Sequence, residues 1–392
     1  MGVNNFDVNY QAYQLISEIH QQATGQKAIA VVDTASFVSV AQAVLATGYE
    51  NTLNAIDYVL ARTLVAVRPY NRKFKGVEAS ADRWGAMVRK ISFGDRDPEQ
   101  DEAYTTVDGQ SVDPFKVRKP DVLVTRFLGS AVYLQHYTRY KDVQLEGAFE
   151  NEASFVAFIN GMLTHMSNEW EQWLEEQVRM TVVNFIGALI DENDSNRVIH
   201  LLTEYNTASG SNLSAQDIFL PANVRPFFQW VYGRIDELTN LMTERSEIFH
   251  SKIAGHKVMR HTPLQYQRVY LLSPIMAQIK ATVKSNTYHD DFLQLSETEA
   301  VSYWQDINSP ASIDVTPSMV DANGAYTQGA EVTESAVMGV IFDRDAVAYN
   351  VYHNEIEPVV YNPAGAYFNI FHRAKIQYSN DMFENGLVLL LD

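Results

Sequence analysis

The sequence of 392 residues predicts an α+β fold. Apolar residues recur at helical spacing from residue 151 to residue 190, which predicts one unusually long helix. The C-terminal stretch 336–392 instead alternates β-rich runs with turn-forming clusters. Between the N-terminus and the long helix lies a polar excursion, 61–124, that a compact domain seldom contains without a purpose. These features predict a helix-and-sheet body that carries an extended appendage.

Composition narrows the class of protein. Hydrophobic residues make up 46% of the chain, which predicts a globular protein. Asp and Glu number 48 against 30 Lys and Arg, giving a formal net charge of -18. A chain this acidic is a poor general binder of nucleic acid, because phosphate binding needs clustered cations. The chain has no cysteine, which excludes disulfides and thiolate metal sites. We predict no membrane span and no membrane partner.

The N-terminal residues 1–60 read as an arm with short helices. One amphipathic face precedes the stop at Thr24-Gly25, and a second ends near Gly48. Such an arm fits either a contact with a neighbouring subunit or two ordinary packed helices.

Charges are segregated along the excursion 61–124. Its first half is mainly basic, with Arg68, Arg72, Lys73, Lys75, Arg83, Arg89 and Lys90. A mainly acidic segment follows, with Asp95, Asp97, Glu99, Asp101 and Glu102. Strand-like pieces at 86–93 and 122–127 flank the acidic segment.

The long helix is predicted to begin after an N-cap at Asn151 and to end at the acidic cluster 191–194. At 1.5 Å per residue it would be roughly 50–60 Å long. Its polar face is acidic: Glu169, Glu171, Glu175 and Glu176.

The second half of the chain predicts further elements. These are a helix at 222–249, a strand at 266–272, a helix through Ile279, and a loop-rich segment at 309–334. A strand at 337–342 follows, then a helical turn through Ala346, Val347 and Tyr349, and two β-rich runs at 367–378 and 387–391. The last run is apolar without alternation, as expected of a strand covered on both faces.

The common catalytic signatures are missing. The chain contains no phosphate-binding glycine loop and no nucleophile elbow. His250, His256 and His261 are too widely spaced for a good zinc site, and we interpret them as surface residues. Asp290-Asp291 is interpreted as a cap. We therefore predict no catalytic, metal-binding or cofactor-binding residues, and no enzyme activity.

The order of strands and turns predicted for the C-terminal stretch resembles that of a known protein family. The segments FDRDA at 342–346 and NPAGAYFN at 362–369 resemble the C-terminal part of tailed-bacteriophage major capsid proteins, which have the Hong Kong ninety-seven-type fold. The resemblance is strongest to capsid proteins of small short-tailed phages. RVYLLSP at 268–274 resembles the start of their axial domain. The implied domains are an arm (1–60), an extended β-hairpin loop (61–124), a peripheral domain with a spine helix (125–200, helix 151–190), an axial domain (201–358) and peripheral C-terminal strands (359–392).

The resemblance implies a structural function. The chain would self-assemble into pentamers and hexamers that form an icosahedral head around double-stranded DNA, without sequence-specific DNA binding. It implies a separate scaffolding protein, a portal protein and a decoration or cement protein as partners. It also implies location in the virion, after assembly in the host cytoplasm.

The charge pattern adds a hypothesis about the interface between subunits. The basic part of the loop, with Arg72, Lys73, Lys75, Arg83, Arg89 and Lys90, would lie on a neighbour's acidic helix face at Glu169, Glu171, Glu175 and Glu176. Some family members also link a loop lysine to a neighbour's asparagine. Lys73, Lys75 and Lys90 could act as donors here, and Asn362 and Asn369 as acceptors.

Two alternatives stay open at this point. An encapsulin-like nanocompartment shares the same shell fold and would carry a docking groove for cargo peptides. A soluble hydrolase or isomerase would instead be a monomer or small oligomer with a polar pocket.

Overall fold

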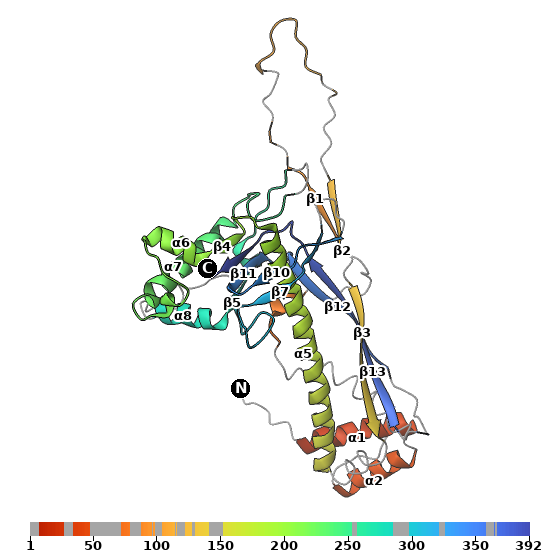
Figure 1. Ribbon diagram of the computed structural model, residues 1–392. Helices are drawn as coiled ribbons and strands as arrows, with labels where there is room; N and C mark the ends of the chain where they lie inside the picture. The colour runs from red at the N-terminus through yellow and green to blue at the C-terminus, as the bar shows by residue number, and fades with distance from the viewer. Residues whose placement is uncertain are drawn as a thin grey trace, which may run out of the picture. The chain divides into compact units, whose positions relative to one another are not determined.

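The fold is described from a computed structural model (Figure 1). The structure describes residues 8–26, 34–47, 72–78, 88–95, 97–98, 104–113, 115, 122–127, 130–140, 152–252, 257–284, 298–320, 326–357, 364 and 367–392. The chain divides into two compact units. Unit 1 comprises 1–72, 131–176 and 351–376, and unit 2 comprises 73–130, 177–350 and 377–392.

Two packed helices open unit 1. Helix α1 (Val8–Thr24) and helix α2 (Thr34–Ala46) contact each other. Ile16 and Ile19 of α1 are buried, as is Val44 of α2. α1 is followed by Gly25 at φ +72°, a left-handed conformation that glycine adopts without steric cost. The predicted stop at Thr24-Gly25 is therefore confirmed.

Unit 1 also holds most of a three-stranded sheet of order β12-β13-β3. The strands are β12 (Val347–Glu357), β13 (Tyr367–Asn380) and β3 (Ser130–Tyr140). The long helix α5 (Glu152–Glu192) begins in unit 1 and continues in unit 2, with the boundary after Glu176. Its 41 residues confirm the long helix that the periodicity predicts.

An aromatic stack joins α5 to β13 within unit 1. Trp170 stacks on Trp173 with ring centroids 5.0 Å apart, and on His372 of β13 at 4.2 Å. His372 is buried, and burial lowers its pKa to about 4. This histidine is therefore neutral at physiological pH.

A mixed five-stranded sheet forms the core of unit 2, in the order β4-β14-β11-β5-β6. Its strands are β4 (Val198–His200), β14 (Gly386–Leu390), β11 (Val337–Asp343), β5 (Gln267–Leu272) and β6 (Thr298–Val301). The pairs β14–β11 and β11–β5 are antiparallel, whereas the two outer pairs are parallel. Every residue of β11 and β14 is buried, which confirms the prediction of a last strand covered on both faces.

Helices cover this sheet. The C-terminal half of α5 places Phe185 against Phe342 of β11, with centroids 5.6 Å apart. A Cβ built at Gly386 would lie 2.6 Å from the Phe185 ring, so β14 approaches α5 too closely for a side chain. Helices α6 (Leu201–Ser209), α7 (Val224–Leu241) and α8 (Ser273–Lys284) group together beside the sheet (Figure 1).

Short elements complete unit 2. They are the 3₁₀ turns η1 (Lys75–Val77), η3 (Asp217–Phe219) and η4 (Leu264–Tyr266), the pair β7 (Ile313–Val315) with β10 (Val332–Glu334), the pair β8 (Ser318–Val320) with β9 (Tyr326–Gln328), and the hairpin β1 (Val88–Phe93) with β2 (Val122–Phe127). The segment predicted to be loop-rich, 309–334, therefore contains four short strands.

Two other predictions about secondary structure were wrong. The helical turn at Ala346–Tyr349 is the start of β12, because Val347 and Tyr349 are buried while Ala348 is less so, a period of two. The helix predicted to reach residue 249 ends at Leu241. The following residues form a turn, and Ser246 makes a β-bridge with Arg260, so Phe249 belongs to a separate buried segment.

The last two strands, β13 and β14, lie in different sheets. β14 pairs with β11 and β4 in unit 2. Residues 367–376, by contrast, belong to unit 1. The assignment of peripheral and axial domains to these two units remains a prediction.

The His372 stack predicts a pH dependence of stability. The folded state holds this histidine neutral down to about pH 4, while an unfolded histidine begins to bind a proton near pH 6.5. The contribution of neutral His372 to the free energy of unfolding is therefore fully present above about pH 6.5. It is lost as the pH falls toward 4, by about 3 kcal/mol in total.

Urea unfolding followed by tryptophan fluorescence from pH 7.5 to 4 measures this loss. The variant His372→Phe is expected to unfold with a weaker pH dependence over that interval, and His261→Gln at an exposed histidine is the control. Equal pH dependence in His372→Phe and wild type would contradict the assignment.

Candidate functional site

The hairpin β1–β2 lies inside the predicted extended loop. Phe93 pairs with Val122 and Ile91 pairs with Val124 in an antiparallel register. Both strands fall where the strand-like pieces were predicted. Successive side chains of a strand point to opposite faces, so Lys90 and Ser92 share one face while Ile91 and Phe93 share the other. We call these the polar face and the apolar face of the hairpin.

The polar face is bonded to a buried turn at 381–385. The Lys90 ammonium lies 2.8 Å from Asp381 Oδ2 and is also paired with Glu384. Arg260 donates to Ser92 Oγ at 2.8 Å and pairs with Glu384 at 3.1 Å. Asp381 and Glu384 are both buried. Two cations thus meet two carboxylates beneath β1, and we call this group the anchor cluster.

The pKa values of the anchor cluster follow from this arrangement. Burial lowers the pKa of Lys90, but Asp381 and Glu384 together raise it above its ordinary value. Burial raises the pKa of Glu384, against the opposing effect of Lys90 and Arg260. Lys90 is therefore a protonated amine held by carboxylates. A protonated amine is a poor nucleophile, so this geometry disfavours Lys90 as a donor for an isopeptide bond.

A second ionic contact lies just beyond β1. Asp95 accepts a hydrogen bond from the Met259 N–H at 2.6 Å and pairs with Arg245 at 2.7 Å. The Met259 N–H is the main cause of the lowered pKa of Asp95, and Arg245 adds to it. Asp97 pairs with Lys257 at 2.8 Å. The segment 245–260 thus binds the beginning of the acidic part of the loop, as the turn at 381–385 binds the end of the basic part.

The chain before the hairpin is fixed by one aromatic residue. Phe74 is buried at φ +61°, a left-handed conformation that is uncommon for a bulky residue. Its N–H lies 3.1 Å from both carboxylate oxygens of Glu299, and its ring packs on Tyr270 of β5 with centroids 4.9 Å apart. Arg179 of α5 lies over the ring at 5.4 Å. Such strain persists only where surrounding contacts impose it, and here they do.

The apolar face of the hairpin is uncovered in the single chain. Ile91 is 59% exposed, Phe93 63% and Val122 54%. Among the described residues between the strands, 104–113 and 115 are all exposed and include Tyr104 and Phe115. A strand pair held by ions on one face therefore presents large apolar side chains on the other.

The other predicted interface residues are distributed as follows. Arg72 and Glu171 pair at 3.2 Å within unit 1, and both are buried. Glu175 is also buried, while Lys73 is partly exposed. Glu169 pairs with His165 at 3.0 Å, and the exposed Glu176 accepts a bond from Gln172 at 3.5 Å.

Some sequence predictions fall outside the described part of the chain. They concern Arg83, the cap at Asn151, His256, the pair Asp290-Asp291, Asn362, and the side chains of Lys75, Arg89 and Asn369. Arg72 and Lys90 of the basic segment pair with Glu171 and Asp381 of the same chain, which lie outside the acidic segment of the loop.

The prediction of surface histidines was wrong for His250. This residue is buried, and burial lowers its pKa. Its Nδ1 lies 2.9 Å from the Ser251 carbonyl. Within the described residues, no three His, Asp or Glu side chains are grouped so as to hold a metal ion. No described helix has the length and apolar character needed to cross a membrane.

Asp381, Glu384 and Arg260 are the functional residues that sequence reasoning missed. They lie at 260 and in the segment 379–386, between the two β-rich runs predicted at 367–378 and 387–391. A signal was present, because the two carboxylates lie beside apolar residues, Met382 and Phe383, that bury the turn. Buried carboxylates require cationic partners, but the sequence does not say which cations.

A family model matches nearly the whole chain, and solved structures resemble its fold. The family model described as Phi29-like phage major capsid protein matches residues 15–390. The capsid structure of Staphylococcus phage Andhra aligns with a TM-score of 0.56 at 12% identity, covering 82% of this chain and 84% of that chain. The structure of head fiber and inner core protein gp22 of native bacteriophage P68 aligns at 0.54 and 13%, covering 82% and 85%. No curated protein matches the chain.

The anchor cluster predicts the outcome of a substitution at Lys90. Lys90→Met keeps roughly the length of the side chain but removes the ammonium that pairs with Asp381 and Glu384, whereas Arg260 still pairs with Glu384. Loss of one partner from a buried ion pair costs about 3 kcal/mol. We expect the amides of β1 to exchange with deuterium at least roughly tenfold faster, while the amides of α5 keep their protection.

Lys257→Met, which removes the exposed pair with Asp97, is the matched control and should change the exchange of β1 little. Unchanged β1 exchange in Lys90→Met would show that the hairpin does not depend on the cluster.

Proposed function

The chain belongs to the Phi29-like phage major capsid protein family, and we propose that its copies form rings of five and six that close into an icosahedral head around double-stranded DNA. As a major capsid protein it is a structural component of the phage head shell and hence of the virion. The fold agrees with phage capsid structures. The encapsulin-like compartment and the soluble hydrolase are not favoured by these comparisons.

One observation carries the proposal for assembly, namely the two-faced hairpin. Its polar face is bound by the anchor cluster, and its apolar face exposes Ile91, Phe93 and Val122. Exposed apolar side chains that form one face point to an interaction surface. Burying a side chain the size of phenylalanine is worth roughly 1.5–3 kcal/mol. We propose that this face lies on a neighbouring copy of the chain.

A contact between a hairpin and a different surface of the neighbour is heterologous. Such contacts generate closed rings when the rotation between copies closes. Because each copy both offers a hairpin and receives one, a ring would bury the apolar face of every subunit. The anchor cluster supports this role, since it fixes the direction of the hairpin before the neighbour arrives.

The charge hypothesis for the interface is kept in a narrower form. Arg72, Glu171 and Lys90 are paired within the chain. The remaining proposal is that Lys75, Arg83 and Arg89 approach the acidic side of a neighbour's α5, where Glu176 is exposed. Exposed pairs of this kind contribute about 0–1 kcal/mol each, so they would set register more than strength.

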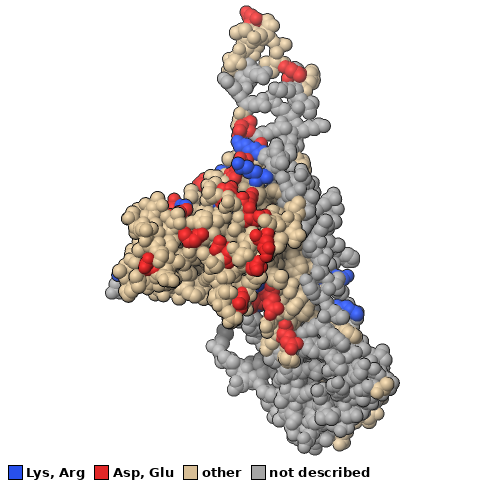
Figure 2. Space-filling view, in the orientation of Figure 1, with Lys and Arg blue, Asp and Glu red and all other residues tan. Residues whose placement is uncertain are grey.

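The surface charge suits a container for DNA. Acidic side chains are prominent over the described part of the face in Figure 2, and basic ones are fewer. With a net charge of -18 the chain would not grip the packaged polyanion. We assign no reaction to the chain. We further propose a separate scaffolding protein, a portal protein and a decoration or cement protein as partners, with assembly in the host cytoplasm.

The proposal predicts that a charge on the apolar face blocks assembly without unfolding the chain. Phe93→Lys places an ammonium where the neighbour would bury a ring, and transferring an unpaired charge out of water is costly. We expect the assembled fraction to fall by roughly tenfold or more. Sedimentation and negative-stain electron microscopy of the chain expressed with its genomic neighbours measure that fraction.

Phe93→Leu keeps the face apolar and is expected to assemble. Thermal unfolding of unassembled Phe93→Lys should match wild type, because the residue is exposed. Normal shells from Phe93→Lys would overturn the role of the hairpin. Particles that stay near 44.3 kDa for wild type under every condition would overturn the assembly proposal itself.

A further inference from the structure

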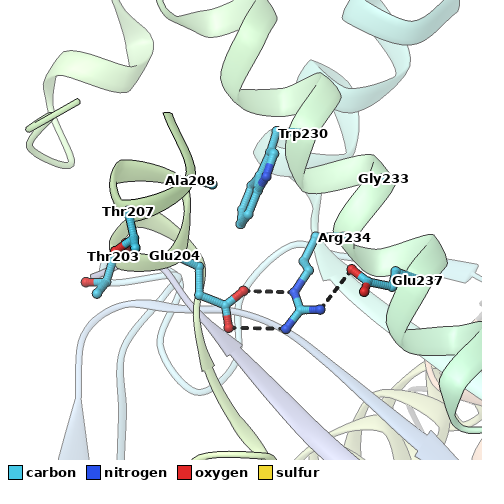
Figure 3. Close-up of a pocket in the computed structure, with 8 residues that line it drawn as sticks. All are labelled: Thr203, Glu204, Thr207, Ala208, Trp230, Gly233, Arg234 and Glu237. Carbon is cyan, nitrogen blue, oxygen red and sulfur yellow. Dashed lines mark hydrogen bonds and ion pairs between the residues drawn. The ribbon is translucent and has the colours of Figure 1, made fainter. Parts of the chain in front are cut away.

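A groove lies between α6 and α7 in unit 2 (Figure 3). Its volume is about 500 Å³. Thr207 and Ala208 line it from α6, and Trp230 and Gly233 line it from α7. A Cβ built at Gly233 meets no atom within 4 Å, so the groove is open beside this residue.

One arginine ties the two walls together at the lower end of the groove in Figure 3. Arg234 of α7 donates to Glu204 of α6 at 2.8 Å and to Glu237 at 2.9 Å. Tyr205 of α6 packs edge-on against Trp230 at 5.5 Å. The charged groups of the groove are thus bonded to each other. The surface that remains available to a binding partner is the indole of Trp230, with Thr207 and Ala208 of α6 opposite it.

The turn before α7 has the opposite shape. Within η3 and the residue after it, Ile218 is buried and holds the turn to the body, while Phe219 is 47% exposed and Leu220 is 51% exposed. Asp217 accepts bonds from the Ser214 N–H at 2.9 Å and the Ser214 hydroxyl at 2.7 Å, which fix the turn. We call Phe219 and Leu220 the knob.

The knob and the groove lie on opposite flanks of α7. The Phe219 ring contacts Phe228 of α7, with centroids 6.1 Å apart. Trp230 and Gly233 follow Phe228 by two and five residues. At 3.6 residues per turn these positions lie roughly 140–200° around the helix from Phe228. One helix therefore separates an exposed apolar pair from a groove whose large apolar side chain is Trp230.

We propose that the knob of one copy inserts into the α6–α7 groove of the next copy around a ring. This inference rests on the proposed assembly function and names a second surface for it. A head-to-tail contact needs two complementary patches on different sides of one subunit. The flanks of α7 supply them in a chain that must meet copies of itself. Insertion would bury Phe219 and Leu220 against Trp230, with no charge left unpaired.

The absence of cysteine from the whole sequence makes the contact directly testable. Ala222→Cys places a thiol beside the knob, and Thr207→Cys places one on the rim of the groove. Both positions are exposed, and both substitutions leave the knob and Trp230 in place. Shells are assembled from a mixture of the two single-cysteine chains and treated with a short bis-maleimide.

We expect dimers in denaturing gels from the mixture and not from shells made of either variant alone. Shells made of chains that carry both cysteines should give a ladder that ends at five and six copies. Shells that form normally but give no cross-link in the mixture would overturn the knob-and-groove contact and leave the assembly function standing. Failure of the wild-type chain to form shells would overturn the assembly function, and with it this contact.

A second variant pair measures the energetic weight of the knob. Phe219→Asp is expected to lower the assembled fraction by roughly tenfold or more, and Phe219→Leu, which keeps an apolar knob, should restore it. Phe219→Leu should unfold near the temperature of wild type, and Phe219→Asp, which loses the ring contact with Phe228, should unfold somewhat lower but remain folded under the assembly conditions. Normal assembly of Phe219→Asp would contradict the proposal. The groove would then be free to bind another protein or a small molecule instead of the knob.

Discussion

The hairpin depends on the ion pairs that Lys90 makes with two buried carboxylates, Asp381 and Glu384. A two-stranded ribbon has little stability of its own in water. The anchor cluster joins β1 to a turn that is itself held in the core, since Asp381 donates its N–H to the Ala346 carbonyl and Gly386 donates to Phe249. The ribbon therefore takes its orientation from the body of the protein and not from a partner.

This arrangement separates two kinds of force. Ionic contacts act within the chain at Lys90 and Arg72, whose carboxylate partners are buried, so that a missing partner is costly. Apolar side chains remain on the outer face of the hairpin and at the knob, where a neighbouring copy would cover them. Apolar contacts suit assembly because they depend little on the ionic strength, whereas exposed ion pairs weaken as salt is added.

Much of the fold could be predicted from the sequence, because strong periodicity is a local property. The helix α5, the strands β11, β13 and β14, and the hairpin strands were each placed within a few residues. The start of β12 was misread because Ala346 and Tyr349, three residues apart, also fit one turn of a helix over so short a window. The partner strands of β14 could not be predicted, because an apolar run without alternation does not name its neighbours.

The site was only partly predictable for a related reason. The sequence shows that Lys90 belongs to a basic stretch and Asp95 to an acidic one, and both prove to be engaged in ion pairs. It does not show that the cations and carboxylates meet across almost three hundred residues, as Lys90 and Asp381 do. Likewise the exposure of Phe93 and Phe219 follows from packing, since apolar residues at strand or turn positions are equally compatible with a core.

Electron cryomicroscopy of assembled shells, at a resolution that shows side chains, tests the central claim most directly. We expect Lys90 of each hairpin to contact Asp381 and Glu384 of its own chain, while Ile91 and Phe93 lie against the neighbouring copy. Density that instead places Lys90 on a neighbour's α5, or leaves Ile91 and Phe93 in solvent, would contradict it.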